Sequence, residues 1–174
     1  MKKTVLVLTS LLSGLFLFSS CSKDEFRNFE ESYSYKLSGK LVLLSEQYAD
    51  STAAVQQEHL QEVPLAMEQG QMRVFDEGEN RVTMTFNDVS GNVTVAKGMQ
   101  REGGFVLDEN QEKLVGLDDG TLTSRKSYVR YSGTAKFYDS AVLFQLKYAG
   151  KVSYKLQTMD IVDSFVECVA VEND

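Results

Sequence analysis

The stretch Arg81-Val82-Thr83-Met84-Thr85-Phe86 decides the fold class, because polar and apolar side chains alternate along all of it. Successive side chains of an extended strand point to opposite faces, so the three apolar residues share one face and the three polar residues share the other. The preceding stretch, Gln71 to Asp76, has a similar composition, and Glu77-Gly78-Glu79-Asn80 separates the two. This arrangement predicts a β-hairpin with one buried face.

The same alternation continues from Ser32 to the end of the chain. The longest strands are expected in the final third, at residues 127–138, 141–148, 151–159 and 164–171. The segment Ala49–Gln69 departs from the pattern, since it is rich in Ala, Gln and Glu and holds the only proline. We expect a short helix over residues 52–60 followed by an edge strand over 63–67; the alternative is a long loop with that edge strand.

Glycines recur at similar places in three predicted strands, as Leu37-Ser38-Gly39, Tyr131-Ser132-Gly133 and Tyr148-Ala149-Gly150. Gly39 and Gly133 are expected inside strands, where glycine marks a bulge or a sharp bend, and Gly150 is expected in a hairpin turn. Long bent strands with short connections predict an all-β protein, an antiparallel meander that closes into a β-barrel. A flat β-sandwich with bulges at Gly39 and Gly133 is the alternative.

The amino terminus has the pattern of a signal peptide. Two lysines precede an almost wholly apolar run, Val5 to Phe18, and Ser19-Ser20-Cys21 follows it. A run of about 14 residues is too short to cross a bilayer as a permanent helix. Cleavage is therefore expected after Ser20, either as in ordinary secretion or because Cys21 itself defines the site.

The sequence Phe18-Ser19-Ser20-Cys21 resembles the lipobox of bacterial lipoproteins, and this resemblance implies that Cys21 is acylated. The following Lys23, Asp24 and Glu25 resemble the export signal of Bacteroidetes surface lipoproteins, which implies a place on the outer face of the outer membrane. The alternative for these three residues is a charged tether. Three parts are expected: a signal peptide (1–20), a lipidated tether (21–31) and one β-barrel domain (32–174).

The stretch Ser34 to Leu41, the meandering strands and the lipobox together resemble the calycin-like, lipocalin-like lipoproteins of Bacteroidetes. A barrel of about eight strands has an interior that is either filled by side chains or wide enough for one small ligand. We therefore expect a small, partly apolar molecule at the open end, contacted by tyrosines whose hydroxyls need partners: Tyr35, Tyr128, Tyr131, Tyr148 and Tyr154. The alternative is a packed module that acts through its outer surface as an accessory subunit, adhesin or inhibitor.

Composition excludes several other functions. Removing residues 1–20 takes away two lysines and no acids, so the net charge changes from −7 to −9, which opposes binding to nucleic acid. Once Cys21 is acylated, Cys168 has no disulfide partner, and the single histidine, His59, lies more than a hundred positions away from it. Motifs for a catalytic nucleophile, a phosphate loop or a metal site are absent from the sequence, so we expect no enzyme, no cofactor and no metal.

Two short motifs indicate a modification. Asp50-Ser51-Thr52 and Asp139-Ser140-Ala141 resemble the O-glycosylation sequence of exported Bacteroidetes proteins. The resemblance implies Ser51 and Ser140 as acceptors, and both are expected in loops.

Overall fold

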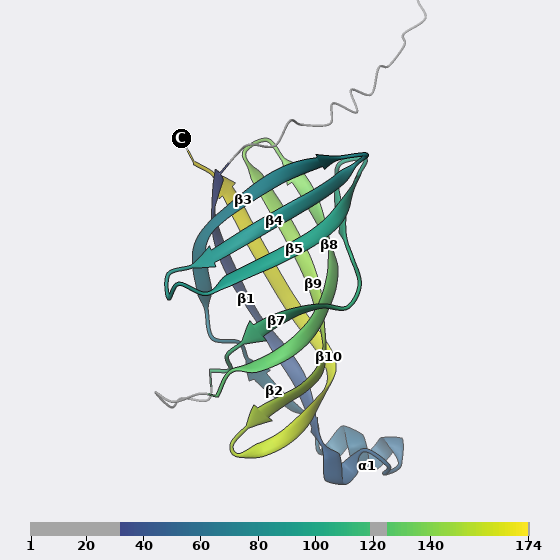
Figure 1. The fold of residues 1–174 in the computed structure, drawn as a ribbon. Coiled ribbons are helices and arrows are strands. Elements are labelled where there is room, and N and C mark those ends of the chain that lie inside the picture. Colours follow the sequence, from purple (N-terminus) through teal and green to yellow (C-terminus); the bar gives the residue numbers. More distant parts are fainter. Residues whose placement is uncertain (1–31, 119–124, 174) are drawn as a thin grey trace, which may run out of the picture.

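The computed structural model describes residues 32–118 and 125–173, which form a β-barrel with one short α-helix at one end (Figure 1). The strands are β1 (Ser32–Ser45), β2 (Gln61–Pro64), β3 (Glu68–Gly78), β4 (Arg81–Asp88), β5 (Val93–Arg101), β6 (Gly104–Leu107), β7 (Gln111–Val115), β8 (Ser127–Tyr138), β9 (Ala141–Tyr154) and β10 (Gln157–Glu172). A 3-10 turn (Glu46–Tyr48) and the helix α1 (Ala53–Glu58) connect β1 to β2. This confirms the helix expected over residues 52–60.

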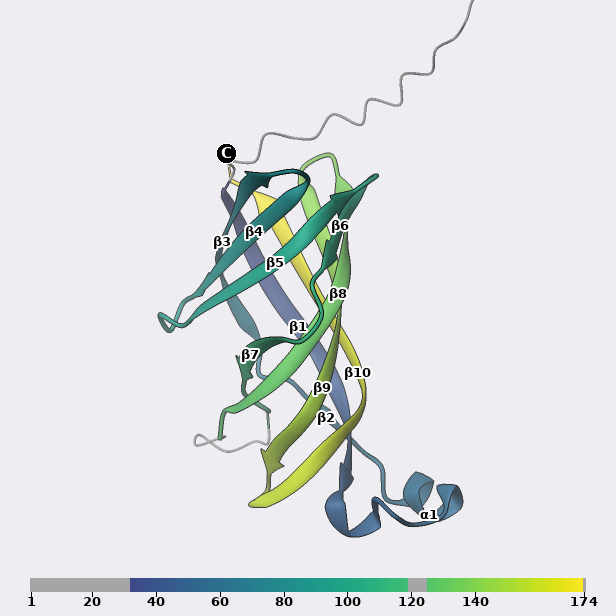
Figure 2. The same cartoon turned by 45° about the vertical axis from the view of Figure 1, so that its right-hand side comes forward.

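The barrel closes because the first and last strands pair. β1 runs antiparallel to β10 from Tyr33 opposite Glu172 to Ser45 opposite Met159. Every other neighbouring pair is antiparallel as well, and eight strands complete the ring in the order β1, β3, β4, β5, β6, β8, β9 and β10 (Figures 1 and 2). The predicted barrel is therefore confirmed and the sandwich is excluded, since a sandwich has no such closing pair.

Two positions in the barrel wall are occupied by two strands each. β3 pairs with the first part of β1, residues 32–37, and β2 pairs with its later part, residues 40–43. In the same way, β6 and β7 pair with successive parts of β8. An isolated bridge between Leu65 and Leu117 joins the two sides of the wall beyond the β4–β5 turn. The barrel wall is therefore interrupted between the β4–β5 turn and β7.

The inward face of the barrel is densely filled. In the hairpin stretch, Val82 and Met84 are fully buried, as the alternation predicts, and Phe86 packs against the core from a half-buried position. Phe86 makes edge-to-face contacts with Tyr35, at 5.2 Å between ring centroids, and with Phe144, at 5.7 Å. Such pairs contribute about 0.5–1.5 kcal/mol each beyond the area they bury.

Gly39 and Gly133 lie inside β1 and β8, where the neighbouring backbone comes too close for any side chain. A Cβ atom at Gly39 would lie 2.2 Å from the carbonyl oxygen of Phe165, and one at Gly133 would lie 2.3 Å from that of Gln145. These glycines allow paired strands to approach closely. Of the bulge or sharp bend expected at both positions, the bulge is not found, since the register of β1 with β10 shifts between Val42 and Leu43 and that of β8 with β9 is regular.

Gly150 was expected in a hairpin turn, and this prediction is wrong. It lies inside β9 with a φ of 119°, and the turn to β10 is formed by Lys155 and Leu156, both in the left-handed region. The predicted strand over 151–159 is accordingly divided between β9 and β10. A turn made of lysine and leucine carries none of the residue types that identify turns in a sequence.

Candidate functional site

A pocket of about 350 Å³ opens through the barrel wall where β7 parts from the β4–β5 turn. Its lining comes from four segments: residues 66–69, the turn and the start of β5, residues 112–116, and the start of β8. We call it the side pocket. Its volume lies in the range of small-molecule sites, although the sequence predicted a site at an open end of the barrel.

The floor of the side pocket is a buried ion pair. Lys113 faces inward from β7, as the alternation with Val115 requires, and its side chain is only 5% exposed. Its Nζ atom lies 2.6 Å from Oε1 of Glu68, the first residue of β3, whose side chain is 18% exposed. A charge in such a place is tolerated only with a close partner, since both ions have lost most of their water.

Tyr35 of β1 lies behind this floor and supports Glu68, although it does not itself line the pocket. Its hydroxyl donates a hydrogen bond of 2.8 Å to Oε1 of Glu68, the same oxygen that Lys113 contacts. Burial, the hydrogen bond to Glu68 and the negative charge of Glu68 all raise the pKa of Tyr35 above its usual value. Tyr35 therefore stays protonated and acts as a donor at any physiological pH.

Apolar side chains gather at the mouth of the side pocket, beside the exposed Glu112 and Lys126. Five large apolar side chains surround it and are each between 48% and 75% exposed: Met67, Val89, Val93, Val95 and Tyr128. Exposed apolar residues that gather around one opening are typical of a binding surface. The pocket thus combines an apolar rim with a charged floor.

The β4–β5 turn, which carries part of this rim, is held by Asp88. One carboxylate oxygen of Asp88 accepts hydrogen bonds from the backbone N–H groups of Ser90 (2.8 Å) and Asn92 (2.7 Å), and the other accepts one from the Asn92 side chain (2.6 Å). Partial burial acts to raise the pKa of Asp88, but these hydrogen bonds outweigh it and the pKa is lowered. The charged form of Asp88 therefore fixes the position of Val89 and Val93 at the rim.

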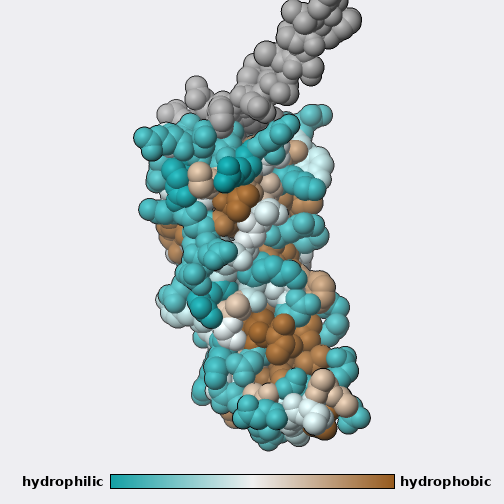
Figure 3. Space-filling view, turned by 90° about the vertical axis from the view of Figure 1, so that its right-hand side faces the viewer, coloured by the Kyte–Doolittle hydropathy of each residue, from teal (hydrophilic) through white to brown (hydrophobic). Residues whose placement is uncertain are grey.

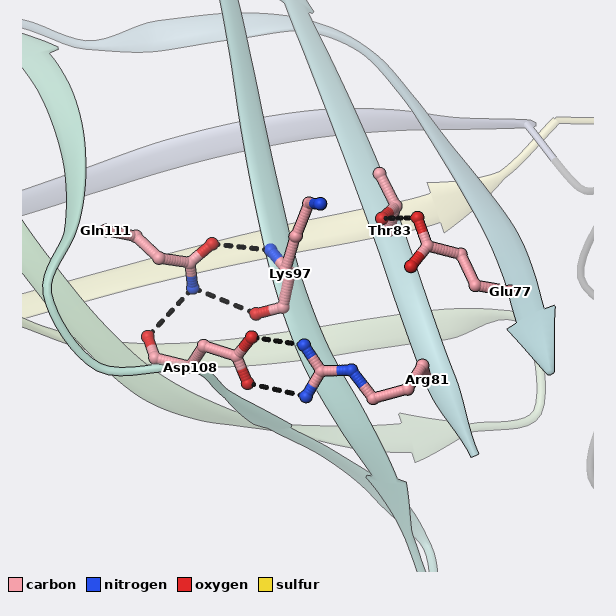
Figure 4. Close-up of polar contacts among 6 residues, drawn as sticks. All are labelled: Glu77, Arg81, Thr83, Lys97, Asp108 and Gln111. Carbon is pink, nitrogen blue, oxygen red and sulfur yellow. Dashed lines mark hydrogen bonds and ion pairs between the residues drawn. The ribbon is translucent and has the colours of Figure 1, made fainter. Parts of the chain in front are cut away.

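A second polar cluster holds β7 against β5 (Figure 4). The Gln111 side chain accepts a hydrogen bond from the backbone N–H of Lys97 and donates to the carbonyl oxygens of Lys97 (2.9 Å) and Asp108 (2.8 Å). Asp108 in turn receives two hydrogen bonds from the guanidinium group of Arg81. We call this group the Gln111 clamp; it replaces backbone pairing between two strands that have begun to separate.

A void of about 20 Å³, which is room for about one water molecule, lies among the side chains inside the barrel. Apolar side chains form most of its wall, with Thr94 and Lys113 on the side that also lines the side pocket. This void is too small for a molecule larger than water.

The five predicted tyrosines fall in different places. Tyr128 lies on the rim of the side pocket, and Tyr35 lies behind its floor, where it is hydrogen-bonded to Glu68. Tyr131 lines the void inside the barrel, and its hydroxyl donates to the carbonyl oxygen of Val95 at 3.3 Å. Tyr154 is half-buried and lies under Lys155, at 5.0 Å, beside the β9–β10 turn, so the structure does not bring it to the pocket.

Tyr148, the fifth of these tyrosines, is fully buried, and its hydroxyl has no hydrogen-bond partner among the described residues. Its ring lies against Tyr131, with 6.3 Å between centroids. Burial, and then the negative charge of Glu68, raise the pKa of Tyr148 well above its usual value.

Sequence reasoning missed the two central residues, Glu68 and Lys113. Lys113 had a usable signal, because residues 113, 115 and 117 alternate as one strand face and the other two are apolar. Glu68 had no such signal, because it lies at the end of Ala49–Gln69, the segment that departs from the strand alternation.

The remaining predicted residues lie elsewhere. Ser140 is exposed in the β8–β9 turn, and Ser51 is half-buried between the 3-10 turn and α1, so both are in loops as expected. Cys21, Lys23, Asp24 and Glu25 lie outside the described residues.

Cys168 and His59 do not form a pair. Cys168 lies inside the barrel, where burial raises its pKa to about 12. His59 stacks on Tyr48 beside α1, with ring centroids 3.8 Å apart.

These observations define the class of the protein as a closed, antiparallel β-barrel with a pocket in its wall. No protein-family model matches the chain, and no curated protein matches it significantly in sequence. Within residues 32–118 and 125–173, no three metal-binding side chains are grouped to hold an ion. In the same residues, none of the helices is both long and apolar enough to span a bilayer.

Proposed function

We propose that this protein is a lipid-anchored cell-surface β-barrel that binds a small amphipathic molecule in the side pocket and releases it unchanged. The observation that carries the proposal is the apolar rim above the Glu68–Lys113 floor. Both features are unfavourable in an empty pocket, because the rim exposes apolar surface to water and the floor keeps a partly dehydrated ion pair. A molecule with an apolar body and a polar end would offset both costs.

Native mass spectrometry of the protein purified from its own host tests this binding. We expect an added mass of a few hundred daltons that is lost on unfolding. Val93→Asp, which places a charge on the exposed rim, should abolish the added mass, whereas Val169→Asp on the outer face of β10 should not. The proposal would be overturned if the purified protein repeatedly carries no ligand, or if Val93→Asp leaves the added mass unchanged.

The membrane anchor is the second part of the proposal and is supported by the signal-peptide pattern that ends at Cys21. Two or three acyl chains on one cysteine hold a protein stably at a bilayer, whereas a single chain does so only marginally. Cys21→Ser should abolish incorporation of labelled fatty acid and leave uncleaved precursor. If the variant is still processed and attached, Cys21 is not the anchor.

Export to the cell surface is tested separately. Replacing Lys23, Asp24 and Glu25 together by alanine should leave lipidation intact and remove accessibility to protease added outside the cell. Unchanged accessibility would mean that these residues are only a tether.

A second function is favoured by a separate observation, the apolar outer face of β10. Val162, Phe165, Val169 and Val171 are each between 43% and 51% exposed. Apolar surface also gathers in two areas of the face drawn in Figure 3. Such a surface would suit an accessory subunit, an adhesin or an inhibitor. Under this alternative, the same mass spectra would show a second protein chain in place of a small molecule.

A further inference from the structure

We infer that the side pocket selects molecules whose polar end is uncharged and carries a hydrogen-bond donor beside an acceptor, as a carboxamide or hydroxyl group does. Glu68 and Lys113 would be the residues that determine this specificity. The inference rests on the proposed function and names the class of ligand.

The first argument is electrostatic. Lys113 and Glu68 are in contact at 2.6 Å, so the floor as a whole is neutral. A carboxylate that approaches Lys113 also meets Glu68, and an ammonium group that approaches Glu68 also meets Lys113. A charged ligand of either sign must therefore either face repulsion or separate the buried pair, and both are unfavourable where little water is present.

The other charged residues of the pocket add one net negative charge to its lining, at Asp88. Glu112 and Lys126 are exposed at the mouth and have opposite charges. Asp88 is occupied by three hydrogen bonds within its own turn. Glu112 and Lys126 offset each other, whereas Asp88 keeps a negative charge that acts on Tyr35 beside the floor. This charge adds to the repulsion of an anionic ligand, whereas a cationic ligand is opposed by Lys113.

The second argument comes from the hydrogen bonds that the floor leaves unmade. Tyr35 and Lys113 both donate to Oε1 of Glu68, and among the described residues Oε2 accepts no hydrogen bond. The Lys113 ammonium has three donors and, within the part of the chain that the structure describes, uses one of them. An acceptor and two donors thus lie side by side at the floor. A carboxamide can donate to Oε2 and accept from Nζ at once, without adding a charge.

The third argument fixes the direction of the ligand. The void of about 20 Å³ inside the barrel is too small for an apolar chain. The apolar body must then remain at the rim, against Val93 and Tyr128, and the polar end must point toward the floor.

The experiment is an NMR titration with four probes that share a six-carbon chain: hexanamide, hexanol, hexanoate and hexylamine. The protein lacks residues 1–21, because the closed barrel and its described core lie within residues 32–173. At pH 7 we expect hexanamide and hexanol to shift the amide signals of the rim, with affinities about tenfold or more above those of the two charged probes. A charged probe that binds as tightly as hexanamide would overturn the inference.

Glu68→Gln provides a second test, because it removes one charge of the pair and keeps the size of the side chain. The floor then carries one positive charge. The affinity for hexanoate should therefore rise about tenfold relative to that for hexanamide, and the affinity for hexylamine should fall further. Glu112→Gln, at the exposed mouth, is the matched control and should leave the order of the probes unchanged.

The outcomes separate the two proposals. If no probe binds, the proposed function and the inference both fail. If hexanoate or hexylamine binds best to the unmodified protein, the pocket is a binding site and only the inference is wrong. The titration of the unmodified protein tests the inference even if Glu68→Gln does not fold.

Discussion

At the scale of single residues, two buried tyrosines of the barrel interior have opposite environments. The hydroxyl of Tyr35 donates to Glu68, whereas that of Tyr148 has no partner among the described residues. A buried hydroxyl without a hydrogen bond costs about 1–3 kcal/mol of folding free energy, and a hydrogen bond to a charged group contributes about 1.5–3 kcal/mol. The same substitution should therefore have opposite effects at the two positions.

We predict that Tyr148→Phe raises the free energy of unfolding by about 1 kcal/mol, because the ring stays in place and the unpaired hydroxyl is removed. Tyr35→Phe should lower it by about 1–2 kcal/mol, because the Glu68 carboxylate loses a donor. Urea denaturation of both variants measures the two changes. A loss of stability in Tyr148→Phe equal to that in Tyr35→Phe would show that the Tyr148 hydroxyl is bonded in solution.

A second prediction concerns Gly133, where a Cβ atom would lie 2.3 Å from a carbonyl oxygen. Gly133→Ala should cost about 3 kcal/mol or more, because β8 and β9 would have to move apart. Gly91, in the β4–β5 turn, is the matched control: its φ is 82°, but no atom lies within 4 Å of its Cβ position. Gly91→Ala should cost only the backbone strain, about 1–2 kcal/mol. Equal thermal shifts for the two variants would mean that close approach is not the reason for Gly133.

The sequence predicted some of these residues and not others, for a physical reason. Gly39 and Gly133 interrupt predicted strands, so an irregularity could be recognised locally, but the close approach of the neighbouring backbone could not. The partnership of Glu68 with Lys113 could not, since it joins residues 45 positions apart on strands that are not neighbours in the wall. Residue type alone predicts the tyrosines as ligand contacts, and only the fold distinguishes a rim tyrosine from a buried one.

At the scale of secondary-structure elements, the side pocket exists because β6 and β7 are separate strands. β6 pairs with both β5 and β8, whereas β7 pairs only with β8 and turns away from β5. The alternation of each strand was visible in the sequence, but the point at which two strands part depends on pairing across the sheet. Likewise, the β9–β10 turn at Lys155 and Leu156 has no local signal.

The Gln111 clamp makes a prediction at this scale. Gln111→Ala removes three hydrogen bonds that join β7 to β5 and to the preceding bend, so it should lower the free energy of unfolding by about 1–2 kcal/mol. Hydrogen exchange should also accelerate at the Lys97 amide, which loses its acceptor. Glu109→Ala, an exposed position in the same bend, is the control and should change neither quantity. An unchanged exchange rate at Lys97 would show that another acceptor replaces Gln111.

At the scale of the whole molecule, the acidic character of the chain is balanced locally by placing carboxylates against donors. Hydrogen bonds from Arg81 hold the pKa of Asp108 below its usual value, and a hydrogen bond from Lys147 does the same for Asp163. The pKa of Asp88 is lowered by its own turn, against the opposing effect of partial burial. All three groups lie outside the apolar core, so they connect the stability of the barrel to pH without titrating its interior.

The sign of the pH dependence follows from these shifts. A carboxyl group whose pKa is lower in the folded than in the unfolded state stabilises the fold above its unfolded value, which is 3.8 for aspartate. That contribution is lost as the pH falls through the folded pKa, because the unfolded chain binds protons first. The free energy of unfolding should therefore change little with pH near neutrality and decrease below about pH 4.

Asp108→Asn isolates one part of this acid sensitivity. The variant should be less stable than the parent at neutral pH by about 0.5 kcal/mol, since the Arg81–Asp108 pair is partly exposed and screened by solvent. Its loss of stability between about pH 4 and pH 2 should also be smaller, because one proton fewer is taken up on unfolding. Urea denaturation at a series of pH values measures both effects. If the free energy of unfolding falls equally with pH in the two proteins below about pH 4, Asp108 has the same pKa in the folded and unfolded chains. Its pair with Arg81 then does not form in solution.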